Sequence, residues 1–234
     1  MDNNTLQTPE DSYKQLRELL SEELKMDSGT EDFVKVLRKF RWYMTLYHCS
    51  IREVRTKFEV LNDELSITHE RNPIQAIYSR VKTPESIFGK MRRMGVPFSV
   101  ESMNANLNDI AGVRIICQYI DDIYTVAEML GRQDDINILT VKDYIKNPKP
   151  NGYRSYHMIV EVPVFFSKTK NIVRVEVQLR TIAMDFWATL EHGMKYKREV
   201  KDADRIVAEL KDCAEQVYAL DTRMQELKER IRTA

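Results

Sequence analysis

One stretch of the chain decides the fold class: Val173-Arg174-Val175-Glu176-Val177-Gln178-Leu179-Arg180. Apolar and polar residues alternate strictly through it, which is the period of a β-strand with one buried face. The apolar residues therefore face the core, and Arg174, Glu176, Gln178 and Arg180 project from the opposite face. Taken alone, this polar face fits a solvated sheet with cross-strand ion pairs better than a functional surface.

The segments around this strand predict the rest of the sheet. Residues 74–81, 110–117, 136–141 and 156–162 also have the composition of strands, and residues 84–94 and 122–130 read as helices. The segment Asn147-Pro148-Lys149-Pro150-Asn151-Gly152 has the chemistry of a loop. The sequence therefore predicts an α+β fold, with a mixed sheet of about five strands flanked by helices.

Both ends of the chain read as helical. A first helix is expected with Thr8 as its N-cap, ending at 27–29, and a second begins at Thr30. Its apolar residues recur at helical spacing and predict core packing: Phe33, Leu37, Phe40, Met44 and Tyr47. Near the C-terminus an apolar seam either folds back on the body or meets another subunit: Leu210, Cys213, Val217, Leu220, Met224, Leu227 and Ile231. We divide the chain into N-terminal helices (1–73), a central domain (74–198) and a C-terminal helix (199–234).

Composition narrows the function classes. The 234 residues carry 36 basic and 36 acidic side chains, and a protein that coats DNA would need a surplus of positive charge. The three cysteines are far apart and odd in number, which argues against a disulfide framework. Neither a signal peptide nor an apolar run of about 20 residues is visible. We expect a soluble, cytoplasmic protein with no DNA or membrane partner, and RNA binding stays open.

Asp109 and Glu176 are the candidate catalytic carboxylates. Asp109 stands at the entrance to the strand 110–117, and Glu176 lies on a strand that could be its neighbour. Two converging carboxylates beside phosphates form a partial shell of hard oxygen ligands, which Mg²⁺ prefers. Aspartate is also common at strand ends, so the pair alone is not diagnostic.

A basic segment begins at the end of the first strand and runs from Arg80 to Arg93, with five positive residues and one negative. Ser86, Lys90 and Arg93 fall at i, i+4 and i+7 and so line one face of a helix. Ile87, Met91 and Met94 supply a separate packing face. A solvated basic face is the simplest interpretation, but the row also suits a polyphosphate.

A third cluster lies in Lys149-Pro150-Asn151-Gly152-Tyr153-Arg154-Ser155-Tyr156-His157. A tight turn at Gly152 would present Tyr153 at a rim, where its ring could stack on a base. Lys149 is near enough in sequence to meet a phosphate of the same ligand, and His157 could donate to an oxygen. Singly, such residues are more often structural.

Together these blocks resemble the synthetase domain of the Rel/Spo family, most closely its short members, the small alarmone synthetases. Matching stretches follow in family order over roughly residues 74–198: Arg80-Val81-Lys82 with Ser86, Lys90 and Arg93; 109–114; 149–157; Val175-Glu176-Val177-Gln178-Leu179-Arg180-Thr181; and Ala183-Met184-Asp185-Phe186-Trp187-Ala188 to Glu191-His192. The resemblance implies a nucleotidyltransferase fold of the polymerase β type. It also implies transfer of the β,γ-pyrophosphate of ATP to the 3′-hydroxyl of GDP or GTP, which releases AMP and makes (p)ppGpp.

The resemblance also implies roles for individual residues. Asp109 and Glu176 would hold Mg²⁺, and Glu176 would be the base for the 3′-hydroxyl. On the ATP side, Arg80 and Arg114 would sandwich adenine, and the phosphates would be bound by Lys82, Ser86, Lys90 and Arg93. On the GDP or GTP side, Tyr153 would stack on guanine and Asp185 would accept bonds from its edge, with Lys149, His157 and Gln178 nearby.

Two departures from the long bifunctional relatives bear on function. Thr140-Val141-Lys142-Asp143 stands where they carry Arg-x-Lys-Asp, and no His-Asp dipeptide occurs in the chain. The missing His-Asp dipeptide predicts synthesis without hydrolysis, whereas the altered motif at 140–143 bears on metal and substrate preference. The resemblance further implies a homotetramer assembled through terminal helices. The alternatives are another nucleotidyltransferase, which would release pyrophosphate, and a catalytically silent regulator that binds nucleotide or RNA.

Overall fold

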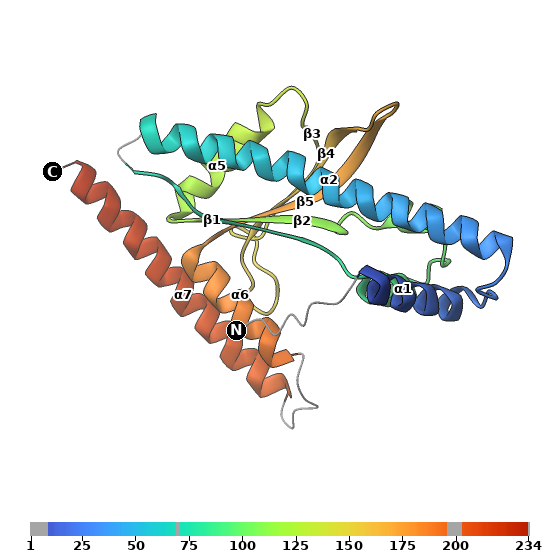
Figure 1. Ribbon diagram of the computed structural model, residues 1–234. Helices are drawn as coiled ribbons and strands as arrows, with labels where there is room; N and C mark the ends of the chain where they lie inside the picture. Colours follow the sequence, from blue (N-terminus) through green and yellow to red (C-terminus); the bar gives the residue numbers. More distant parts are fainter. Residues whose placement is uncertain (1–8, 69–70, 196–202, 234) are drawn as a thin grey trace.

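The computed structural model describes residues 9–68, 71–195 and 203–233, and a five-stranded mixed sheet lies at its centre (Figure 1). The strands are β1 (Ile74–Val81), β2 (Ala111–Cys117), β3 (Asn137–Asp143), β4 (Tyr156–Phe165) and β5 (Lys170–Thr181). The helices are α1 (Pro9–Leu24), α2 (Glu31–Thr68), α3 (Pro84–Met94), α4 (Val100–Asn106), α5 (Ile120–Gly131), α6 (Ile182–Lys195) and α7 (Ala203–Arg232).

The sheet has the order β1-β2-β5-β4-β3, with β2 and β5 parallel and every other pair antiparallel. In Figure 1, α2 and α5 lie on one side of this sheet, and α6 and α7 lie on the other. The alternation predicted for 173–180 is confirmed, because the side chains of Val173, Val175, Val177 and Leu179 are buried on the α2 side. The polar residues between them therefore face away from α2.

Helix α3 begins and ends where its sequence predicts. The Thr83 side chain accepts a hydrogen bond from the Ser86 backbone N–H, and Pro84 occupies the first turn. Gly95 ends the helix with a φ of 66°, a left-handed conformation that glycine adopts without strain. The predicted packing face is correct for Ile87 and Met91 and wrong for Met94, which is 46% exposed because the helix ends beside it.

The predicted apolar stripe of the second helix packs into the main core. Phe33, Leu37, Phe40 and Tyr47 are buried, and Met44 is partly buried against the same cluster as the sheet residues. Helix α2 therefore shares one core with the sheet and packs on the side of β5 opposite its polar face. The N-cap predicted at Thr8 lies outside the described residues.

Two helices were not predicted as such. Helix α4 has only seven residues, too few for a periodic signal, and its start depends on a side-chain cap at Ser99. Helix α6 follows β5 without a connecting loop, and the hydroxyl oxygen of Thr181 accepts a hydrogen bond from the Met184 N–H at their junction. Because no loop intervenes, Asp185 in the first turn of α6 lies close in the chain to the polar residues of β5.

The apolar seam of α7 divides into two parts. Leu210 and Val217 pack on Trp187 and Ala188 of α6, so this part folds back. The second part is exposed and consists of Leu220, Met224, Leu227 and Ile231. Among the residues that the structure describes, no helix combines the length and the apolar character needed to span a bilayer.

Candidate active site

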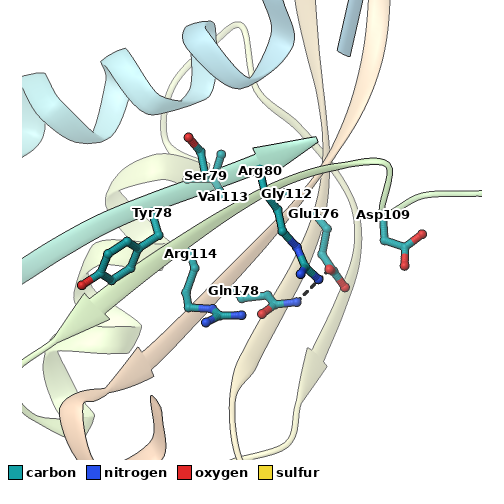
Figure 2. A pocket seen from close by; sticks show the side chains of 9 residues that line it. All are labelled: Tyr78, Ser79, Arg80, Asp109, Gly112, Val113, Arg114, Glu176 and Gln178. Atoms are coloured by element: carbon teal, nitrogen blue, oxygen red, sulfur yellow. Dashed lines mark hydrogen bonds between the residues drawn. The ribbon is translucent and has the colours of Figure 1, made fainter. Parts of the chain in front are cut away.

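A pocket opens on the polar face of the sheet, over β1, β2 and β5 (Figure 2). Its lining is formed by Tyr78, Ser79, Arg80, Asp109, Gly112, Val113, Arg114, Glu176 and Gln178. The strand register explains the grouping: Arg80 pairs with Gly112, which pairs with Glu176, and directly opposed residues share a face. Gly112 leaves the floor between Arg80 and Glu176 without a side chain.

Asp109 lies just before β2 and is held by two lysines from different elements. Its Oδ2 accepts from Nζ of Lys82, at 2.6 Å, and from Nζ of Lys90 on α3, at 2.7 Å. Burial alone would raise the pKa of Asp109, but the bonds from both lysines outweigh it and hold that pKa below its usual value. Asp109 is therefore an anion at neutral pH.

Glu176 projects from β5 into the same pocket. Nδ1 of His157 lies 3.3 Å from its Oε1, and Nε2 of Gln178 donates to its Oε2 over 2.8 Å. Burial would raise the pKa of Glu176, and Asp109 adds to this, but His157 and Gln178 together lower it below the ordinary value. Both candidate carboxylates therefore line the same pocket.

The carboxylate pair fits a divalent cation. Oδ1 of Asp109 is buried and has no hydrogen-bond partner, so this hard oxygen is available to bind a cation. Among the described residues, no group of three or more His, Cys, Asp or Glu could hold a metal. A bound cation would therefore complete its shell with water or substrate oxygens, as is usual in phosphoryl transfer.

The residues predicted on the ATP side lie on or directly after β1, on β2 and on α3, and two of them, Arg80 and Arg114, line this pocket. Arg80 extends from β1 toward Glu176 and Gln178, as Figure 2 shows. On α3, Lys90 contacts Asp109, whereas Ser86 and Arg93 are exposed on the same helix and line no part of the pocket. Arg114 points into the pocket from β2, and its Nη1 donates to Oδ1 of Asp185 over 3.2 Å.

The residues predicted on the guanine side form an aromatic and polar cluster beside the pocket. The Tyr153 hydroxyl lies 2.8 Å from Nε2 of His157, and Nζ of Lys149 lies 4.6 Å from the centre of the Tyr153 ring. Gln178 connects this cluster to Glu176, because it pairs with His157 across the sheet. Through Arg180, which bonds to both Asp185 and Tyr153, one network joins residues from four segments: Lys149, Tyr153, His157, Gln178 and Asp185.

Two residues of this network had no predicted role. Arg180 is 5% exposed and donates hydrogen bonds to Tyr153 and Asp185, and Tyr144 packs edge-on against the rings of Tyr153 and His157. The alternation of residues 173–180 already predicted that Arg180 projects from the polar face of β5. Nothing in the sequence signalled Tyr144, because its contacts depend on how β3 and β4 pair.

Comparison with known proteins identifies the family. Residues 79–201, more than half of the chain, match the family described as "Region found in RelA / SpoT proteins". The chain belongs to the RelA/SpoT family. The match contains the carboxylate pair and the aromatic cluster, and it ends before α7.

Alignments with individual relatives of this RelA/SpoT-family chain cover more than four fifths of its length. It is 41% identical over 201 residues to the GTP pyrophosphokinase YwaC of Bacillus subtilis, an alignment that covers 86% of this chain and 96% of the relative. The structure resembles small alarmone synthetase 1 of Bacillus subtilis bound to its product pppGpp, with a TM-score of 0.77, 33% identity and coverage of 84% and 100%. The same synthetase bound to AMPCPP matches with a TM-score of 0.71 and 31% identity, again over 84% and 100%. The predicted nucleotidyltransferase-like fold is therefore confirmed.

Proposed function

We propose that this chain is a GTP pyrophosphokinase, which transfers the β,γ-pyrophosphate of ATP to the 3′-hydroxyl of GDP or GTP and releases AMP. The observation that carries the proposal is the meeting of Asp109 and Glu176 in one pocket, in a fold shared with small alarmone synthetases. One of those relatives is described with pppGpp and with AMPCPP, so a guanine product and an ATP-like ligand both bind that fold. Both substrates are cytoplasmic nucleotides, and we infer that compartment for the reaction.

The basic side chains around Asp109 suit the phosphates of ATP. Lys82 and Lys90 share one carboxylate oxygen, so together they carry more positive charge than Asp109 neutralises. Arg93 and Ser86 are exposed on the helix that carries Lys90 and would extend the phosphate contacts; the Ser86 hydroxyl accepts from Thr83 and keeps its own proton for donation. Arg80 and Arg114 enter the pocket from neighbouring strands, an arrangement that supports an adenine ring held between them (Figure 2).

The aromatic cluster suits the guanine nucleotide. The Lys149 ammonium lies over the Tyr153 ring, where a guanine base would stack. An arriving base would displace this ammonium, which lies close enough to pair with a phosphate of the same nucleotide. We expect Tyr153→Ala to raise KM for GDP or GTP far more than KM for ATP, whereas equal increases would contradict stacking on guanine.

The reaction needs a base and neutralisation of phosphate charge. Glu176 has a lowered pKa, so it is ionised at neutral pH and accepts the proton as the 3′-hydroxyl attacks. Mg²⁺, held by Asp109 and Glu176, would supply charge neutralisation at the transferring phosphates. Lys82 and Lys90 keep the Asp109 carboxylate fixed and add positive charge on the donor side.

The exposed part of the α7 seam supports assembly with further copies of the chain. Leu220, Met224, Leu227 and Ile231 are between 39% and 79% exposed, and Ile182, Phe186 and Leu190 of α6 are also largely exposed. We propose that these stripes meet in a homotetramer. Replacing Leu220 and Met224 by glutamate should reduce the mass of the particle in light scattering, and an unchanged mass would contradict the proposal.

Product analysis tests the proposed reaction. Purified protein with ATP, GDP and Mg²⁺ should form AMP and a guanosine carrying a 3′-pyrophosphate, separable by ion-exchange chromatography. Release of pyrophosphate instead of AMP would indicate a different nucleotidyltransferase, and binding without turnover would indicate a silent regulator. The chain lacks a His-Asp dipeptide, so we expect the product to persist on prolonged incubation.

A further inference from the structure

Arg180 is an almost fully buried cation at the end of β5, and it is bonded to several residues of the guanine-side cluster. Its side chain is 6% exposed. Nη2 donates to the Tyr153 hydroxyl over 2.6 Å and to Oε1 of Gln178 over 3.1 Å, and Nη1 donates to Oδ1 of Asp185 over 3.0 Å. Nε faces the Ser155 hydroxyl at 3.4 Å. One guanidinium thus joins residues from three segments of the chain.

The hydrogen-bonding groups of Arg180, Tyr153 and His157 determine which partner donates in each bond of this network. A guanidinium only donates, so the Tyr153 oxygen accepts from Arg180 and keeps its own proton for donation. Nε2 of His157 lies 2.8 Å away, in reach of that proton. We assign His157 the tautomer that fits both contacts, with its own proton on Nδ1, 3.3 Å from the Glu176 carboxylate that accepts it. A chain of bonds leads from Arg180 to the carboxylate that is to act as base.

We propose that Arg180 is a positioning residue for the acceptor side of the reaction: it orients Glu176 through Tyr153 and His157, and it holds Tyr153 and Asp185 where guanine binds. This inference rests on the proposed function. Arg180 itself lines no part of the pocket, so it acts through the residues it contacts.

The geometry requires an arginine rather than a positive charge alone. The planar guanidinium donates to Tyr153 and Asp185 from different nitrogen atoms. A lysine has a single ammonium nitrogen, which could not occupy both positions at once. The nearby Arg154 is also buried, but it serves another purpose. It bonds to Glu215 and lies over the Tyr218 ring, and both of these residues belong to α7.

Steady-state kinetics of Arg180→Met and Arg180→Lys test the proposal. With ATP saturating, we expect Arg180→Met to raise KM for GDP by about tenfold or more and to lower kcat. KM for ATP should stay within about twofold, because Arg114 keeps its bond to Asp185. Arg180→Lys should recover only part of the loss. Full recovery by lysine, or equal increases in both KM values, would overturn the proposal.

A double-mutant cycle with Tyr153→Phe isolates the route to Glu176. Phenylalanine keeps the ring and removes the hydroxyl that connects Arg180 to His157. The Arg180→Met change should therefore lower kcat less in the Tyr153→Phe background than in the wild type, and strictly additive losses would contradict the chain of bonds. Should Arg180→Met fail to fold, Arg180→Lys takes its place in the same cycle.

Arg71→Met is the control for the loss of a half-buried arginine. Arg71 forms a two-bond ion pair with Asp122, and neither residue lines the pocket, so its removal should lower thermal stability and leave KM for GDP unchanged. An equal rise in KM for GDP in this control would show a general effect and refute the positioning role. A wild-type protein that makes no (p)ppGpp would refute the proposed function itself, whereas an active wild type with an unaffected Arg180→Met variant refutes only this inference.

Discussion

Arg114 donates a hydrogen bond to Asp185 over 3.2 Å, so a residue expected beside adenine is bonded to one expected beside guanine. The same Asp185 oxygen also accepts from Arg180, and burial together with the charge of Arg180 lowers the pKa of Arg114. One carboxylate therefore stabilises two neighbouring cations, one on each side of the site. The sites that we propose for donor and acceptor would share this contact.

Asp185→Asn should consequently affect both substrates. The amide removes the negative charge between the two guanidinium groups, which then repel each other without compensation. We expect KM to rise for ATP as well as for GDP, measured with the other substrate saturating. A change confined to GDP would show that Asp185 serves only the guanine edge.

Glu176→Gln should abolish turnover while the fold and most ATP binding persist. The amide keeps the shape of the side chain but cannot accept a proton, and a lost general base typically costs about 10²–10⁴ in rate. Turnover is measured as AMP release and ATP binding by calorimetry. Glu161→Gln, on the neighbouring strand β4 and outside the pocket lining, is the matched control and should stay active. Near-normal turnover of Glu176→Gln would remove Glu176 from the base and metal roles.

Gly152→Ala should displace the loop that carries Tyr153. Gly152 has a φ of 85°, and a Cβ there would lie 2.5 Å from Cβ of Ala214 on α7. Strain of the backbone and overlap with α7 act together, so we expect a loss of stability of about 1 kcal/mol or more and a higher KM for GDP.

Gly193→Ala is the matched control for this change. Gly193 lies in α6, has no positive φ, and a Cβ there would meet nothing within 4 Å. Alanine should therefore leave KM for GDP unchanged and keep or raise the melting temperature. If both glycine variants behaved alike in KM, the contact between the loop and α7 would have no part in acceptor binding.

Asp221 on α7 should make stability fall as pH rises. Burial raises its pKa above the unfolded value, and the hydrogen bond from Thr181 only partly offsets this. Its contribution is therefore complete below the unfolded pKa, near 4, and is lost as pH rises through the folded pKa. We expect Tm of the wild type to fall relative to that of Asp221→Asn between pH 4 and pH 7.

Asp121→Asn should show the opposite sign. Burial would raise the pKa of Asp121, but Lys228 and Gln225 outweigh it and lower that pKa, so its stabilising contribution is lost as pH falls through the folded pKa. The wild type should gain Tm relative to Asp121→Asn as pH rises toward 7. Parallel pH profiles for the two variants would contradict the assignment of Asp221 as a buried acid with a raised pKa.

Local signals in the sequence were sufficient for the sheet and for much of the site. The alternation from Val173 to Arg180 depends only on the two-residue period of a strand, and the limits of α3 depend on Thr83 and Gly95. Because Asp109 stands just before β2 and Glu176 lies within β5, their meeting could be predicted as soon as these two strands were taken as neighbours. The roles of the individual site residues stay predictions until the variants are measured.

Tertiary structure alone decided what surrounds these residues. The sequence of α7 shows one apolar seam, yet Val217 is covered by α6 and Leu220 is exposed, because beyond Val217 the side of α7 that carries Asp221 and Lys228 faces the body. Likewise, the alternation in β5 predicted the face from which Arg180 projects but not its hydrogen-bond partners, since Tyr153 is 27 positions earlier in the chain. Side-chain direction follows from local backbone geometry, whereas hydrogen-bond partners follow from the packing of distant segments, which no short stretch of sequence encodes.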